Sequence, residues 1–140
     1  MFSTVLNVVP TMSAEAPAVD LERRHFTGGV RVRDITADVG GQEIKLICVH
    51  FDAGARSRPH LHTEHDQYLI YVSGTGVVAM DGGEDVHVSA GSVVCLPKGH
   101  LHMHGATDDG PASHLSFLVD YSDLVWDPPV PDTWRQFMST

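Results

Sequence analysis

Glycine-rich turns divide the middle of this 140-residue chain into many short runs of β-forming residues. Turns such as Gly40-Gly41, Gly74-Thr75-Gly76 and Asp81-Gly82-Gly83 separate runs rich in Val, Ile, Leu and aromatic residues. No amphipathic helix of useful length is indicated by the spacing of apolar residues. Such a chain buries its apolar faces by stacking or curling antiparallel sheets, so the sequence predicts an all-β sandwich or barrel.

A single domain is expected, because 140 residues suit one core. We expect an N-terminal arm over 1–29, a barrel over 30–121 and a C-terminal tail over 122–140. The tail carries several prolines between Trp126 and Trp134, which predicts no strand there and packing against the barrel or a partner subunit. The strands are expected at 30–33, 43–51, 60–62, 67–73, 77–80, 85–88, 93–96, 101–106 and 113–121.

The charge balance argues against some classes of partner. Nine basic and 18 acidic residues give a net charge of -9, whereas nucleic acids and anionic membranes attract clustered Lys and Arg. No positive charge precedes Arg23 and no run approaches ~20 apolar residues, so we expect neither a signal peptide nor a membrane span. Cys48 and Cys95 are expected to be buried free thiols of a cytoplasmic protein.

Histidine is the unusual residue of this composition. Of the ten histidines, seven fall between positions 60 and 104. In a strand, His60 and His62 point to the same face, roughly 6.5–7 Å apart, so both imidazoles can reach one metal ion. Gln67 and His102 are further candidate donors. This density favours a metal or acid–base site over a surface cluster or a pH sensor.

Two spaced motifs make this sequence resemble the cupin family. The first motif stands here as Gly54, His60, His62, Gln67 and Gly74, with Gln where the family usually has Glu. The second stands as Gly91, Pro97, Gly99 and His102, with Ala106 where Asn is usual. The resemblance implies an antiparallel jelly-roll barrel in one domain. It also implies that His60, His62, Gln67 and His102 hold a metal ion inside the barrel, unless they survive only as packing in a metal-free cupin.

Gln67 is the departure that bears on the metal. A carboxamide brings no charge, so a divalent ion held by three imidazoles and Gln67 keeps its full +2 charge. That favours Lewis-acid chemistry over dioxygen chemistry without deciding between them. Zinc is the expected metal, although iron, nickel or cobalt are compatible with the same donors.

Three further side chains are expected to face the same space. Alternation from His102 places His104 inward, either as a general acid–base or as a core histidine hydrogen-bonded to a neighbour. Alternation from Gln67 places Leu69 and Tyr71 inward as candidate substrate-binding residues. An aromatic wall with a hydroxyl suits an aromatic or polyketide ligand.

Among cupins, the resemblance is nearest in character to small aromatic polyketide cyclases of antibiotic biosynthesis. It implies an aldol-type ring closure and aromatisation, with the metal stabilising an enolate and His104 removing a proton. A dioxygenase of the quercetinase or cysteine-dioxygenase type and a non-catalytic ligand-binding cupin remain open, as do sugar isomerases and lyases. The arm and the tail are hard to bury on one small barrel, so a homodimer is expected.

Overall fold

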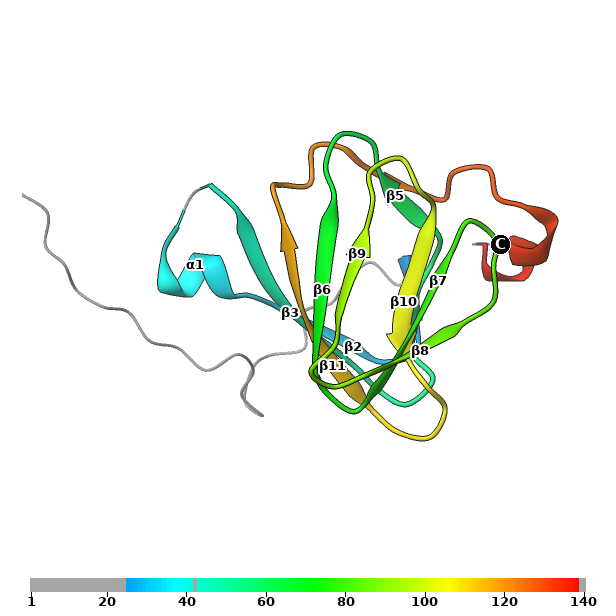
Figure 1. Cartoon of the computed structure of the whole chain (residues 1–140), viewed down its shortest axis with the longest axis horizontal. Helices are drawn as coiled ribbons and strands as arrows, with labels where there is room; N and C mark the ends of the chain where they lie inside the picture. The colour runs from blue at the N-terminus through cyan, green and yellow to red at the C-terminus, as the bar shows by residue number, and fades with distance from the viewer. Residues whose placement is uncertain (1–24, 42, 139–140) are drawn as a thin grey trace, which may run out of the picture.

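Two antiparallel sheets curl around a shared core in the computed structural model, which describes residues 25–41 and 43–138 (Figure 1). Each sheet turns one face inward, and the short turns between strands carry the motif glycines. Gly99 shows why glycine is needed, since its φ of 78° lies in the left-handed region. The all-β jelly roll predicted from the sequence is therefore confirmed.

Sheet A is organised around β10 (His102–Ala106). Its register pairs β10 with β7 on one side and with both β4 and β5 on the other, while β1 pairs with β4 and β12 with β5. β8 extends the sheet beyond β7. The other strands of sheet A are β1 (Phe26–Thr27), β4 (Arg56–Ser57), β5 (His60–His62), β7 (Thr75–Met80), β8 (Val86–Ser89) and β12 (Leu124–Trp126).

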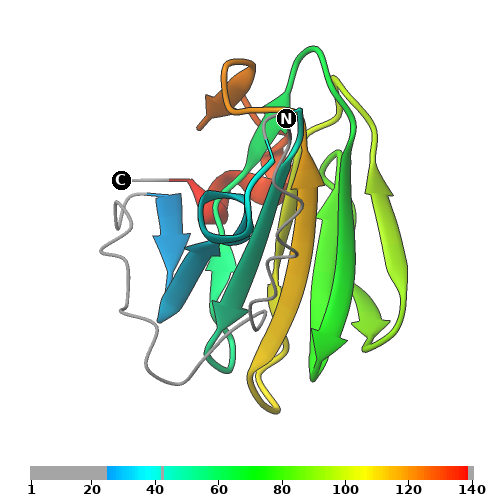
Figure 2. The ribbon, with the colours of Figure 1, turned by 90° about the vertical axis from the view of Figure 1, so that its left-hand side faces the viewer.

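Sheet B runs in the order β2-β3-β11-β6-β9. Figure 2 shows β3, β11, β6 and β9 side by side along this sheet. The strands of sheet B are β2 (Val30–Asp34), β3 (Lys45–Phe51), β6 (Gln67–Ser73), β9 (Val93–Leu96) and β11 (Ala112–Leu118).

The core fills the space between the two sheets. Alternation of side chains along β6 and β3 directs Leu69, Tyr71 and Phe51 inward, where none of them is accessible to solvent. Burying a side chain of this size stabilises the fold by roughly 1.5–3 kcal/mol. The core therefore occupies one part of the barrel interior and leaves the remainder for polar side chains.

The C-terminal tail packs on the outer face of sheet A. Its 3₁₀ helix η2 (Asp132–Phe137) places Trp134 against Leu101 and Met103, and the Trp134 indole nitrogen donates to the Gly83 carbonyl oxygen at 2.9 Å. Trp134 is 1% exposed within its own chain. This part of the tail needs no partner subunit to be buried.

Short elements were missed at the sequence level. These are the helix α1 (Ile35–Val39), capped by the Asp34 carboxylate, and the strands β1, β4 and β12. Strands of two or three residues are too short to show an alternation of apolar and polar side chains. The segment between Trp126 and Trp134 was expected to hold no strand, and β12 ends at Trp126, just before its prolines. Sheet A thus reaches from Phe26 to Trp126, beyond the predicted barrel, while the predicted arm lies mostly outside the described residues.

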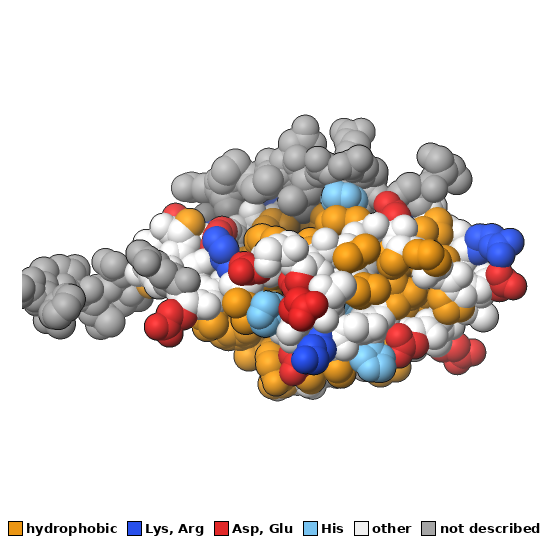
Figure 3. Space-filling model, turned by 90° about the horizontal axis from the view of Figure 1, so that it is seen from above, with side chains coloured by type: hydrophobic (Ala, Val, Ile, Leu, Met, Phe, Trp, Pro, Cys, Tyr) orange, Lys and Arg blue, Asp and Glu red, His pale blue; other side chains and the backbone are white. Residues whose placement is uncertain are grey.

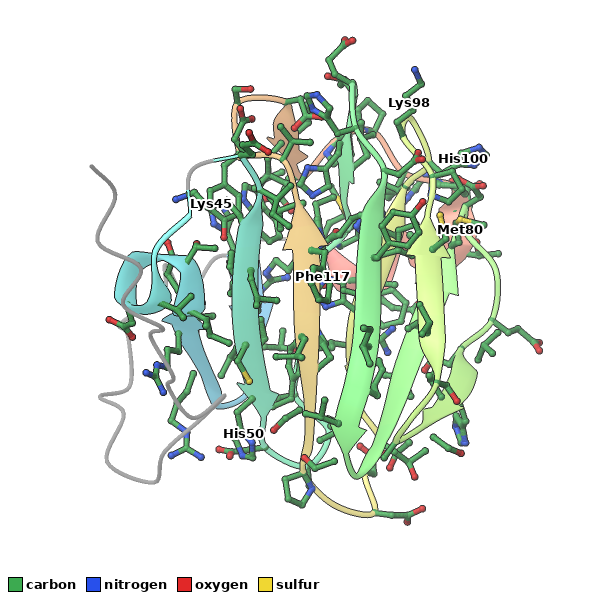
Figure 4. The ribbon with its side chains drawn as sticks, turned by 60° about the vertical axis from the view of Figure 1, so that its left-hand side comes forward. Lys45, His50, Met80, Lys98, His100 and Phe117 are labelled. Atoms are coloured by element: carbon green, nitrogen blue, oxygen red, sulfur yellow. The ribbon has the colours of Figure 1, made fainter. Side chains whose placement is uncertain are left out.

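The outer face of sheet B carries exposed apolar side chains. Phe117 lies on this face (Figure 4), and Tyr68, Val72 and Val93 on the neighbouring strands are exposed. Figure 3 shows hydrophobic side chains gathered over much of another face, with acidic side chains among them. The expected homodimer, which would need an exposed apolar face as its interface, stays a prediction.

The two cysteines differ in exposure. Cys48 is buried, whereas Cys95 is exposed because it faces outward on β9 opposite Tyr68, so the expectation of two buried thiols was wrong for Cys95. Both thiols are free. Within the described ranges, no helix has the length and apolar character needed to cross a membrane.

Candidate metal centre

Four histidines converge inside the barrel from two neighbouring strands. β5 contributes His60 and His62, and β10 contributes His102 and His104; the register places His102 opposite His60. All four are buried. The intervening Met103 points outward, toward the tail, as alternation requires. The ring centroids of His60 and His102 are 4.4 Å apart, and those of His60 and His104 are 5.2 Å apart.

The donor nitrogens of His60, His102 and His104 lie within 4.8 Å of one another. That spacing allows one ion to contact all three. The centroid of the His62 ring lies 6.1 Å from that of His102 and 6.3 Å from that of His60. His62 is therefore outside this closest group. The structure therefore brings His104 nearer to the other donors than His62, which the sequence did not predict.

Local backbone orients two of these rings. His60 Nδ1 donates to the Arg58 carbonyl oxygen at 2.8 Å, and His102 Nδ1 donates to the His100 carbonyl oxygen at 3.1 Å. A carbonyl only accepts, so the proton sits on Nδ1 and the Nε2 lone pair is free. A histidine that binds a metal ion through Nε2 must be in this tautomer.

His62 is oriented by a carboxylate from far along the chain. His62 Nδ1 lies 3.3 Å from Asp123 Oδ1, and both side chains are buried. Burial alone would raise the pKa of Asp123, but hydrogen bonds from the Glu64 backbone and from His62 hold that pKa below its ordinary value. Asp123 was not singled out in the sequence, where it is one acid among many.

Gln67 opens β6 and points into the barrel. Its Nε2 donates to Ser116 Oγ at 2.7 Å, which fixes the orientation of the carboxamide. Its Oε1 has no hydrogen-bond partner among the described residues. The oxygen of Gln67 is thus presented to the same space as the imidazoles.

His104 is hydrogen-bonded to a second buried histidine. His104 Nδ1 lies 3.1 Å from His114 Nε2, and the His104 backbone N–H donates to Ser57 Oγ. Burial, together with the neighbouring His114, lowers the pKa of His104 well below its ordinary value. The general acid–base role expected for His104 stays a prediction.

Burial also favours the neutral form of His60, His102 and His114. Desolvation and the nearby His102 lower the pKa of His60 well below its ordinary value, and desolvation lowers the pKa of His102 to about 4. The pKa of His114 is lowered to about 3 for the same reason. Neutral imidazoles are the form that binds a metal ion.

Leu69 and Tyr71 do point inward, but neither is among the described residues that line the cavity. Gly76 makes room for the Tyr71 ring, since a Cβ there would lie 2.1 Å from it. The Tyr71 hydroxyl donates to the Gly105 carbonyl oxygen at 2.9 Å, and burial raises its pKa. In this structure both side chains serve the core.

A cavity of about 490 Å³ opens beside the histidines. His60, His62, Gln67 and His104 line it, whereas exposed His100 pairs with Asp81 outside (Figure 4). The wall is mainly apolar and includes residues that the sequence did not single out as part of a site. These are Phe26, Val32, Ile47, Val49, Leu118, Tyr121, Leu124 and Trp126.

The residues present fit a bound metal ion. Three atoms of the candidate donors are buried without a hydrogen-bond partner among the described residues: Gln67 Oε1, His102 Nε2 and His104 Nε2. His114 Nδ1, on a residue that lines the cavity, is a fourth such atom. Buried polar atoms are nearly always satisfied in native proteins, so three converging exceptions indicate a missing partner. Imidazole nitrogens with a carboxamide oxygen are donors that zinc and other first-row ions accept.

Comparison with known proteins agrees with this geometry. The family model for the Cupin domain matches residues 47–118, which hold all the donors named above. The pectin degradation protein KdgF of Dickeya dadantii is 28% identical over 78 residues. That match covers 56% of this chain and 66% of the relative.

Among solved structures, a cupin-like protein from Thermotoga maritima is 26% identical, with a TM-score of 0.72, over 91% of this chain and 98% of its own. The polyketide cyclase RemF from Streptomyces resistomycificus is 16% identical, with a TM-score of 0.73, over 93% and 91%. KdgF from Halomonas sp. is 23% identical, with a TM-score of 0.61, over 84% and 98%. The last two likenesses concern the fold.

Proposed function

Because the chain belongs to the cupin family, we propose that it is a metal-dependent enzyme acting on a small, apolar carbonyl compound. The observation that carries the proposal is the set of unpartnered donor atoms beside an apolar cavity. Each buried polar atom left unsatisfied costs roughly 1–3 kcal/mol of stability, which a bound ion offsets. We favour zinc, and a zinc ion held there would supply Lewis-acid polarisation of a substrate carbonyl.

The proposed donors are the four converging imidazoles and one carboxamide oxygen. His60, His102 and His104 form the tight group, and His62 and Gln67 line the same cavity. We assign His104 to this set and not to proton abstraction, since its Nε2 is unpartnered and its burial makes it a poor base. His114 then accepts from His104 Nδ1 and keeps the His104 Nε2 lone pair directed at the other donors.

The cavity wall supports an apolar, ring-bearing substrate. Phe26, Ile47, Leu118 and Trp126 supply apolar contact area, and the described lining residues include no Lys or Arg to pair with a substrate carboxylate. The wall would hold the chain of such a substrate folded and exclude water from it. We propose aldol-type ring closure, as in a polyketide cyclase, for this reason.

A second candidate rests on the relative that acts in pectin degradation. The 28% identity to KdgF favours a pectin-derived sugar acid as the substrate class. Such a ligand is polar and anionic, so it matches the apolar wall less well. The reaction of this candidate would use the same donors.

Two measurements test the proposed function. Elemental analysis of the protein as isolated is expected to give zinc, and the zinc-loaded protein is expected to bind an aromatic β-diketone more tightly than galacturonate. Fluorescence titration is suitable, because Trp126 lines the cavity. Tighter binding of galacturonate would favour the second candidate.

Oxygen dependence separates the proposal from a dioxygenase. We expect turnover of a β-polyketone to be the same with and without oxygen. Iron in the isolated protein, together with oxygen consumption, would defeat the cyclase proposal in favour of the dioxygenase.

A further inference from the structure

We propose that Asp123 is a positioning residue that completes the metal site from outside the matched Cupin domain. The match ends at residue 118, and Asp123 lies in the segment that leads into β12. Its role is to fix the His62 ring and the turn that joins His62 to Gln67. The inference presupposes the metal site proposed above.

Both oxygens of the Asp123 carboxylate are engaged. Oδ1 lies 3.3 Å from His62 Nδ1, while Oδ2 accepts from the backbone N–H groups of Glu64 at 2.9 Å and His65 at 3.0 Å. The side chain is only 3% exposed. A desolvated carboxylate with three donors holds them more firmly than a neutral acceptor would.

The backbone around Asp123 is fixed to the same turn. The Thr63 N–H donates to the Asp123 carbonyl oxygen at 3.1 Å, and in the next register position Leu124 pairs with His62. The main chain and the side chain of Asp123 therefore both bind the same short segment. This double attachment places the carboxylate with little freedom relative to the His62 ring.

The chemical consequence concerns the His62 tautomer. An ionised carboxylate accepts only, so it holds the proton on His62 Nδ1 and leaves Nε2 as a lone-pair donor facing the cavity. The turn from Thr63 to Asp66 is stabilised by the same carboxylate through Oδ2. One side chain thus sets the direction of His62 and the path of the chain toward Gln67.

Asp120 provides a matched control in the same segment. Its carboxylate is exposed and accepts from the backbone and hydroxyl of Ser122, with no hydrogen bond to a proposed donor. Asp120→Asn removes the same charge as Asp123→Asn at nearly the same place. Asp120, Asp123 and His65 also have ligand atoms within 4.8 Å of one another. Each variant removes one carboxylate of that group, so a difference between the two variants comes neither from net charge nor from zinc bound there.

The experiment compares wild type, Asp123→Asn and Asp120→Asn by zinc affinity, measured in competition with a chromophoric chelator. In Asp123→Asn an NH₂ group replaces one acceptor, so one of the three donors loses its partner. We expect a 10- to 100-fold loss of zinc affinity in this variant and no change in Asp120→Asn. Equal affinities for wild type and Asp123→Asn would overturn the proposal.

A second readout uses wild type and does not depend on the variant folding. Nitrogen-15 NMR of metal-free protein, with the His62 signal assigned by its loss in His62→Ala, is expected to show the proton on Nδ1. A proton on Nε2 would overturn the proposal even if the zinc affinities differ. Failure of wild type to bind zinc would defeat the proposed function, while this tautomer still decides the role of Asp123.

Discussion

Four of the five proposed donors fall into two groups that are oriented in different ways. His60 and His102 are each held by the carbonyl oxygen two residues earlier, within the same strand and turn. His62 and Gln67 are held by side chains 61 and 49 residues away, Asp123 and Ser116. The orientation of the first group depends on local backbone, whereas that of the second depends on contacts between distant parts of the chain.

Loss of a locally oriented donor is expected to have the largest effect. His102→Ala removes an imidazole that no neighbouring side chain replaces, so zinc affinity should fall by at least about 100-fold. Elemental analysis after gel filtration checks this. His87→Ala, which removes an exposed histidine of β8, is the control and should retain zinc. Stoichiometric zinc in His102→Ala would show that His102 is not a donor.

The low pKa of His102 predicts how the stability of the protein depends on pH. The pKa of His102 is about 4 in the folded protein, below the ordinary value of 6.5, so the unfolded chain takes up its proton first as pH falls. The contribution of His102 to the free energy of unfolding of the metal-free protein is fully present above pH ~6.5. It falls by about 3 kcal/mol as the pH decreases toward 4. Urea unfolding at several pH values measures this; a flat profile would contradict it.

Loss of a remote partner is expected to have a smaller effect. Ser116→Ala removes the acceptor of Gln67 Nε2 and frees the carboxamide to rotate, so zinc affinity should fall about 10-fold. Ser113→Ala, on the same strand but bonded to His50, is the matched control. If both serine variants bind zinc equally well, the remote orientation of Gln67 has no role.

The smallest change keeps every donor and alters one charge. In Gln67→Glu, Ser116 can turn its hydroxyl to donate, so the site remains intact and zinc should be retained or bound more tightly. The added negative charge weakens polarisation of the substrate, so turnover should slow at equal zinc occupancy. A variant that is at least as active as wild type, and only in oxygen, would favour the dioxygenase.

The same difference between local and remote orientation explains which features the sequence could predict. The strands at His60 and Gln67 and the inward direction of their side chains followed from alternation and glycine turns, which are local properties. Asp123 and Trp126 could not be found this way, because their importance arises from pairing between β12 and β5. The low pKa of His104 was also missed, since it comes first from burial inside the closed barrel and then from His114 on the opposite sheet.

The pairing of β12 with β5 also bears on where this domain can be cut. A chain shortened at Leu118, the end of the family match, would keep every proposed donor yet leave β5 without its outer neighbour. Unpaired strand edges recruit strands from other molecules, so aggregation would threaten such a fragment. The segment after Leu118 is thus expected to protect the edge of β5 from pairing with other molecules.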